Sequence, residues 1–326
     1  MSRAVIISSC GDPFILLMVH RLFKKYWYDE VDRFYINFNN HIKTPTKAVG
    51  ELLKIVSEDP KVHLIYHPEG IGNGPPITEL LGICKEDHIL LLEDDFFIFT
   101  PGKVDECFKR IESGEVDLLG SPRYAFGEVA DAAKKKYNLN YSGLGDRGFG
   151  WWPTAFFCKR NDLMRTDLDF GSNKYPKGQY FKELDHTFVE DAHTDTFTWA
   201  SLQLRYLGLK AGDVPQYHAD PDEVENKIKG EINWKDGKPF WLHGGSLSSG
   251  WGGYLSGSIP EIQSETNRKE IETRVAFWSI CSEITDGFEA FKESYKQGIE
   301  SLIINAELDR QQIAKKIIIY KELLGI

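Results

Sequence analysis

The chain has 326 residues, of which 41% are hydrophobic and 13% aromatic, so it can bury a large core and is not expected to be disordered. Its formal net charge of −10 provides no overall attraction for nucleic acid or for an acidic membrane. Five cysteines without a CxxC pair favour a reducing compartment over a disulfide framework or a zinc cluster. Because we find no secretory leader and no apolar run of about 18 residues, we expect a soluble, cytoplasmic protein.

The first third of the chain alternates short apolar runs with helical patterns. Strands and helices are expected to alternate over 4–8, 13–25, 33–38, 46–57, 62–66, 78–83 and 89–92. This order predicts an α/β fold with a mostly parallel sheet and right-handed crossovers. Ligands of such sheets bind beyond the carboxyl ends of the strands. The candidate donor-binding residues at these ends are Ser8, Asp12, Asn37, Asn39, Gly72 and Asn73.

Three carboxylates, Glu93, Asp94 and Asp95, follow the apolar strand 89–92. Carboxylates at the end of a buried strand repel one another and are costly to desolvate together. A divalent metal that takes carboxylate oxygens is an economical source of compensating charge. The alternative is a solvated turn between two strands.

The middle of the chain is expected to carry a helix over 103–113, a strand over 116–120 and a polar, glycine-rich loop over 130–150. An aromatic strand over 151–160 follows. Trp151 and Trp152 suit stacking on the apolar face of a sugar, and they suit a core position equally well.

A second acidic pair, Glu190 and Asp191, precedes an expected helix over 191–204. Asp191 could cap this helix, could act as a general base, or could do both. Two histidines are candidates for a further metal ligand. His218 follows the helix by one strand, and His243 opens a Gly/Ser loop that also offers backbone amides.

From residue 259 onward the pattern changes to three amphipathic helices, which should pack against the rest of the chain or against a second subunit. Contact of the basic, apolar segment 315–321 with a membrane surface is a further alternative.

The order strand, loop, helix and then Leu91-Leu92-Glu93-Asp94-Asp95 resembles the nucleotide-binding half of a GT-A glycosyltransferase, most like the inverting family 2. The resemblance implies that Asp95 ligates Mn²⁺ or Mg²⁺ and that Asp94 or Glu93 contacts ribose or a metal-bound water. This chain has Glu-Asp-Asp where the commoner pattern is Asp-x-Asp.

The later segments also resemble that family. Glu190-Asp191, a helix and then Leu207-Gly208-Leu209 resemble its base motif, which implies that Asp191 is the catalytic base and that Glu190 orients the site or binds acceptor. The residues expected to line the acceptor side are Arg123, Trp151 and Trp152.

These expectations describe a GT-A domain over 1–258, with a nucleotide-sugar half over 1–122 and an acceptor half over 123–258. A C-terminal helical extension over 259–326 could mediate homo-oligomer formation. The expected reaction moves a sugar from a UDP- or GDP-type donor to a glycan, lipid-linked or other hydroxyl acceptor, with inversion. The alternatives are a sugar-phosphate nucleotidyltransferase, a non-catalytic nucleotide- or glycan-binding protein, and a transferase that glycosylates DNA bases, although the acidic chain makes nucleic acid the less expected partner.

Overall fold

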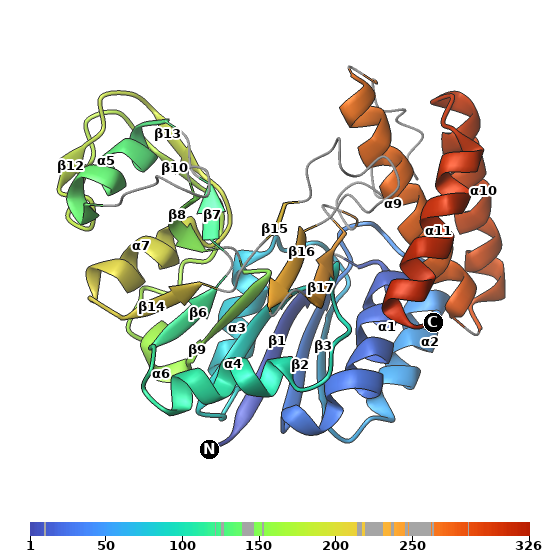
Figure 1. Ribbon diagram of the computed structural model, residues 1–326, viewed down its shortest axis with the longest axis horizontal. Coiled ribbons are helices and arrows are strands. Elements are labelled where there is room, and N and C mark those ends of the chain that lie inside the picture. The colour runs from blue at the N-terminus through green and yellow to red at the C-terminus, as the bar shows by residue number, and fades with distance from the viewer. Residues whose placement is uncertain are drawn as a thin grey trace.

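A seven-stranded sheet is the centre of the fold (Figure 1). The computed structural model describes residues 1–9, 11–120, 122–124, 127–138, 147–151, 153–213, 217–218, 231–235, 238–244, 247, 262, 264–285 and 287–326. The strand order is β14-β6-β9-β4-β1-β2-β3, and every pairing is parallel except those made by β9. The strands are β1 (Arg3–Ser9), β2 (Arg33–Asn39), β3 (Val62–His67), β4 (His88–Glu93), β6 (Leu118–Gly120), β9 (Ala155–Lys159) and β14 (Ala211–Asp213).

Helices cover both faces of this sheet, because its central strands are apolar on both sides. The helices are α1 (Pro13–Leu22), α2 (Thr46–Ser57), α3 (Gly74–Ile83), α4 (Lys103–Glu112), α6 (Arg160–Leu163) and α7 (Thr198–Tyr206). Val5 and Ile7 of β1 belong to a large core with α1, α2 and α4, whereas Ala4 and Ile6 face a second core with α3 and α7. The α/β fold class predicted from the sequence is confirmed.

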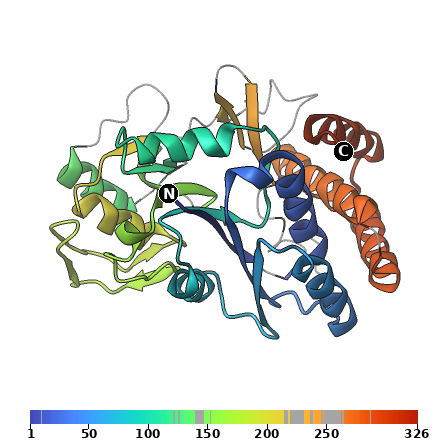
Figure 2. The same cartoon turned by 90° about the horizontal axis from the view of Figure 1, so that it is seen from below.

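Three C-terminal helices complete the larger core. They are α9 (Glu265–Ile284), α10 (Glu289–Asn305) and α11 (Arg310–Leu324). Figures 1 and 2 show them beside α1. Phe277 stacks on Phe97 at 5.3 Å between ring centroids and on Tyr320 at 4.2 Å, and Phe291 stacks on Phe14 at 5.4 Å. The appendage therefore shares its apolar core with the sheet, and the expected boundary after residue 258 lies outside the described residues.

A smaller lobe stands apart from the sheet, at the upper left of Figure 1. Its elements are α5 (Gly127–Tyr137), β7 (Pro122–Tyr124), β8 (Arg147–Trp151), β10 (Asn173–Tyr175), β11 (Tyr180–Phe181), β12 (His186–Thr187) and β13 (Ala192–Thr194). Its own apolar core includes Tyr175, Phe181, Phe188 and Trp199.

Two sequence predictions in this lobe are wrong. The expected loop over 130–150 begins as helix α5, because Val129, Ala132 and Ala133 recur at helical spacing and pack into the lobe core. The helix expected from residue 191 begins at Thr198, because residues 192–194 pair with β10 and Phe197 has a positive φ of 68°.

A second sheet has the order β15-β16-β17-β5 and lies near the upper edge of the main sheet in Figure 1. Its strands are β15 (Tyr217–His218), β16 (Glu231–Lys235), β17 (Lys238–His243) and β5 (Phe96–Ile98). Strand β5 follows β4 after one turn, so pairing of β5 with β17 brings His243 opposite Phe96. In the described part of the chain, none of the helices has the length and apolar character that crossing a membrane requires.

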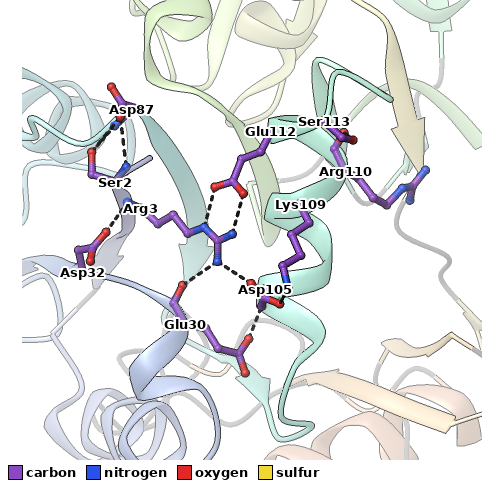
Figure 3. A network of polar contacts seen from close by, with 10 residues as sticks. All are labelled: Ser2, Arg3, Glu30, Asp32, Asp87, Asp105, Lys109, Arg110, Glu112 and Ser113. Carbon is purple, nitrogen blue, oxygen red and sulfur yellow. Dashed lines mark hydrogen bonds and ion pairs between the residues drawn. The ribbon is translucent and has the colours of Figure 1, made fainter.

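A polar network ties the amino end of the sheet to α4 (Figure 3). Arg3 donates two hydrogen bonds of 2.8 Å to the carboxylate of Glu112 and one of 2.8 Å to Asp105. The carboxylate of Glu30 accepts from the backbone N–H groups of Gly102 and Asp105, at the start of α4. The first strand is therefore fastened at the end opposite to its carboxyl edge.

Candidate functional site

Polar residues meet at the carboxyl ends of three neighbouring strands. Ser8 of β1 lies in register with Glu93 of β4 on one side and with Asn37 of β2 on the other. Residues in register on parallel strands point to the same face of a sheet. The convergence expected from the sequence therefore holds for these three side chains.

Two polar atoms in this row have no protein partner among the described residues. They are Ser8 Oγ and Asn37 Oδ1, and both are buried. The amide Nδ2 of Asn37 donates to Glu79 Oε2 at 2.6 Å, and His67 Nε2 lies 2.8 Å from the same oxygen. Buried polar atoms without a partner are costly, so they indicate a place where a ligand or water supplies the hydrogen bond.

A second convergence lies at the end of β4, where Glu93, Asp95 and His243 bring one ligand atom each to within 4.8 Å of one another. His243 Nε2 lies 3.2 Å from Asp95 Oδ1 and 3.3 Å from Glu93 Oε2. The acids of this group are two positions apart in the chain. Asp94, between them, is buried and does not belong to the group.

The backbone after β17 holds Asp95 in place. The N–H of Gly244 donates to the carbonyl oxygen of Asp95 at 2.8 Å, and the N–H of Leu247 donates to Asp95 Oδ2 at 3.0 Å. A Cβ on Gly244 would lie only 2.3 Å from Leu247 Cδ1. Any larger residue at this position would therefore displace the Leu247 side chain.

The charges of the group compensate one another. Burial lowers the pKa of His243, but the carboxylates of Asp95 and Glu93 outweigh it and hold that pKa well above its usual value. Burial raises the pKa of Asp95, but His243 and the Leu247 N–H outweigh it and hold the pKa below its usual value. Without a cation, the imidazolium is thus the counter-ion of the acids.

The same donor set suits a divalent cation. Carboxylate oxygens are the ligands that Mg²⁺ and Mn²⁺ prefer, and imidazole is the commonest metal-binding side chain. Two carboxylates and one imidazole from β4, the turn after it and β17 therefore fit such an ion. Of the histidines predicted as ligands, His243 lies in this group, and the side chain of His218 is outside the described residues.

Two other predicted donor-binding residues have structural partners. Asp12 is buried and caps α1 through hydrogen bonds from the N–H groups of Phe14 and Ile15. Asn39 is buried as well, and its Nδ2 donates to the carbonyl oxygen of Ser9 at 2.8 Å. These contacts fix the carboxyl ends of β1 and β2.

The loop before α3 is exposed at Gly72 and Asn73. Gly72 has a φ of +78°, which favours glycine, and none of the described residues lies within 4 Å of the position that its Cβ would take. Helix α3 begins at Gly74, earlier than expected, because Pro75 and Pro76 suit a first helical turn.

The second acidic pair lies in the small lobe, between β12 and β13. Glu190 and Asp191 are both exposed. Asp191 Oδ1 accepts a hydrogen bond of 2.9 Å from the N–H of Lys177. Asp191 therefore does not cap a helix, which was one of its two expected roles.

The aromatic pair expected on the acceptor side is described only in part. Trp151 is 2% exposed, and the guanidinium of Arg205 lies 4.5 Å from the centroid of its ring. The core alternative therefore describes Trp151. Arg123 pairs with Gly150 through the β7 and β8 backbones, while its side chain and the whole of Trp152 lie outside the described residues.

Sequence reasoning missed Glu79, which joins Asn37 to His67. The signal that could have found Glu79 is its position in the second turn of α3, shortly after the Gly/Pro loop. It also missed Glu128, which binds the segment before Asp191.

No family model and no curated protein matches the sequence. Among solved structures, S. aureus TarS 1-349 aligns with 100% of this chain and 90% of its own, at 10% identity and a TM-score of 0.43. TarS 1-349 in complex with UDP-GlcNAc aligns with 99% and 80%, at 8% identity and a TM-score of 0.42. The mannosyltransferase PcManGT from Pyrobaculum calidifontis, in complex with GDP-Man and Mn²⁺, aligns with 99% and 85%, at 10% identity and a TM-score of 0.43. Likeness at this level of identity concerns the fold alone.

Proposed function

We propose that this chain is a metal-dependent glycosyltransferase that moves a sugar from a nucleotide-diphosphate sugar to an acceptor hydroxyl. The observation that carries the proposal is the convergence of Glu93, Asp95 and His243 at the carboxyl end of β4. Beside it lie Ser8 Oγ and Asn37 Oδ1, for which the described residues supply no hydrogen-bond partner. The carboxyl edge is where sheets of this kind bind nucleotides.

On the donor side, Glu93, Asp95 and His243 would hold Mn²⁺ or Mg²⁺. Such an ion, when bound, supplies Lewis-acid stabilisation of the charge that develops on a departing diphosphate. Ser8 Oγ can donate to the nucleotide or accept from it, and Asn37 Oδ1 can accept from a nucleotide N–H or O–H. The sequence resemblance favours a UDP- or GDP-type donor.

On the acceptor side, Asp191 is the proposed general base. Its Oδ1 is oriented by the Lys177 N–H, and Oδ2 takes the proton from the acceptor hydroxyl as that oxygen attacks the anomeric carbon. Attack on the face opposite to the diphosphate inverts the configuration of the sugar. The acceptor class proposed is a glycan or lipid-linked hydroxyl.

A thermal-shift screen of UDP-, GDP-, CMP- and dTDP-sugars, each with and without Mn²⁺, tests the proposal. A donor at 100 times its dissociation constant should add about 2.7 kcal/mol to the free energy of unfolding. We expect a shift with one nucleotide type that requires Mn²⁺ and is lost in Asp95→Asn. The matched control is Glu58→Gln, which changes an exposed acid after α2 and should keep the shift. If no donor shifts the transition at any metal concentration, the proposal fails.

A further inference from the structure

The carboxylate of Glu128, in the first turn of α5, binds three donors from one short segment of the lobe. Its Oε1 accepts from His186 Nε2 at 2.7 Å and from the N–H of Val189 at 2.7 Å. Its Oε2 accepts from the N–H of Glu190 at 3.1 Å. One side chain therefore fixes two consecutive backbone N–H groups immediately before Asp191.

The charge of Glu128 suits this role. Desolvation raises the pKa of Glu128, but the hydrogen bonds from Val189, His186 and Glu190 outweigh it and hold the pKa below its usual value. The group is thus ionised at neutral pH, and an ionised carboxylate accepts hydrogen bonds without donating any.

The residues on either side of this contact are held as well. Phe188 is buried in the lobe core, its N–H donates to the carbonyl oxygen of Gln179, and its own carbonyl accepts from Gly178. Asp191 Oδ1 accepts from the Lys177 N–H. The side chains of Glu190 and Asp191 are nevertheless exposed.

The fixed backbone affects where the exposed carboxylates of Glu190 and Asp191 lie. The Lys177 N–H orients one oxygen of Asp191, and the position of both carboxylates also depends on the backbone that carries them. Glu128, which is half-buried, is the anchor of this loop and accepts three hydrogen bonds from it. A surface loop does not need these bonds to form, since its backbone N–H groups can donate to water instead. The anchor therefore fixes the backbone that carries the two exposed carboxylates.

We propose that Glu128 is a positioning residue that fixes the direction of the Glu190 and Asp191 carboxylates toward the acceptor. This inference rests on the proposed function, because it assumes that Asp191 is the base. Loss of the Glu128 carboxylate leaves the Val189 and Glu190 N–H groups to water, and the backbone that carries the Asp191 carboxylate can then shift. The donor ligands come from β4, the turn after it and β17, so they keep their geometry.

Three variants separate positioning from general stability. Glu128→Ala removes all three bonds. Glu128→Gln keeps one oxygen that can accept from His186 and Val189. Its NH₂ group then faces the Glu190 N–H, and because both groups are donors that hydrogen bond is lost. Asp131→Asn, on the exposed side of the same helix, changes an acid that has no part in the contact and is the matched control.

The experiment combines hydrogen exchange with steady-state kinetics on the full chain. In Glu128→Ala we expect faster exchange of the Val189 and Glu190 amides, a fall in kcat of about 10- to 100-fold, and an unchanged donor KM. Glu128→Gln should lie between Glu128→Ala and wild type in both readouts, and Asp131→Asn should match wild type. If Glu128 had only a structural role, its variants would not lower kcat step by step while leaving the donor KM unchanged.

Two kinds of result would overturn the inference. Unchanged amide exchange in Glu128→Ala would show that the contact does not hold the segment. A second result would be faster amide exchange in Glu128→Ala together with a kcat equal to that of Asp131→Asn. If Asp191→Asn is inactive at the same time, this result overturns the positioning role and leaves the proposed base intact. Full activity in Asp191→Asn is a different result, since it removes the base itself and with it the reason for the anchor.

Discussion

The hydroxyl of Tyr295 donates a hydrogen bond of 2.7 Å to Asp12 Oδ2, and so joins C-terminal helix α10 to the residue that caps the first helix. Both side chains are buried. Asp12 follows β1 at the carboxyl edge that carries Ser8. The C-terminal helices therefore help to fix the end of the strand on which the candidate site is built.

Replacing Tyr295 with phenylalanine should destabilise the fold. Tyr295→Phe keeps the ring that packs on Phe14, at 4.7 Å between centroids, and removes only the hydroxyl. Asp12 Oδ2 then stays buried without that donor, which costs about 1–3 kcal/mol. Urea unfolding of the variant measures the loss. An unchanged unfolding midpoint would mean that the bond contributes nothing to the docking of α10.

Asp12 should also give the stability a defined pH dependence. Burial raises the pKa of Asp12 from 3.8 to about 6, although the bonds from Tyr295, Ile15 and Phe14 oppose it. The folded state therefore holds this proton more tightly than the unfolded chain, and the contribution of Asp12 to stability falls as the pH rises from about 4 to about 6.

Asp12→Asn removes that titration and keeps an oxygen to cap α1. The free energy of unfolding of the variant minus that of wild type should therefore rise across the same pH window and level off above about pH 7. Urea titrations at several pH values give this difference. A difference that stays constant, or that falls with rising pH, contradicts the assigned pKa.

Gly244 should be needed for the geometry of the acidic group. In Gly244→Ala the new Cβ meets Leu247, whose N–H holds Asp95 Oδ2, so Asp95 should lose its fixed direction. We expect Mn²⁺ affinity to fall by about 10-fold, comparable to losing a hydrogen bond that orients a metal ligand. Gly82→Ala in α3 is the control, because its added Cβ has no neighbour within 4 Å in the described part of the chain. Equal Mn²⁺ affinity in the two variants would contradict this role.

The Arg3 network should contribute to stability without affecting donor binding. Arg3→Lys leaves one ammonium to face Glu112 and Asp105, and it cannot reproduce the paired bonds to Glu112, so we expect a loss of about 1–3 kcal/mol. Arg33→Lys on neighbouring β2 is the control, since Arg33 makes one exposed bond to the carbonyl of Pro60. Equal urea midpoints would contradict the assignment, and so would a weakened donor shift in Arg3→Lys.

The sheet was predictable because each of its central strands is marked by a local run of apolar residues. A run such as Ile89 to Leu92 is apolar on both faces, and α2 spans residues 46–57 as expected because its apolar residues recur at helical spacing. Parallel topology then puts Ser8 and Asn37 beside Glu93 without further information. Asp95 was predicted as a metal ligand with either His218 or His243 as a further ligand, and His243 Nε2 lies 3.2 Å from Asp95 Oδ1.

What could not be predicted depends on contacts between distant segments. The choice of Glu93 over Asp94 is decided by the turn after β4 and by the approach of β17 to β5. Trp151 is buried because Gly120, on another strand, leaves room for its ring: a Cβ there would lie 2.6 Å from Trp151 Cδ1. The segment before Asp191 is shaped by Glu128, 62 positions before Glu190 in the chain.

The central claim is that Glu93, Asp95 and His243 form a divalent cation site, and Mn²⁺ titration by calorimetry tests it most directly. Wild type and Glu58→Gln should bind one Mn²⁺ with equal affinity. Asp95→Asn and His243→Ala should each weaken binding by at least about 10-fold, because each removes one of three protein ligands. Saturable binding that neither substitution weakens, or no binding by wild type, would contradict the account and leave His243 as the counter-ion of the two acids.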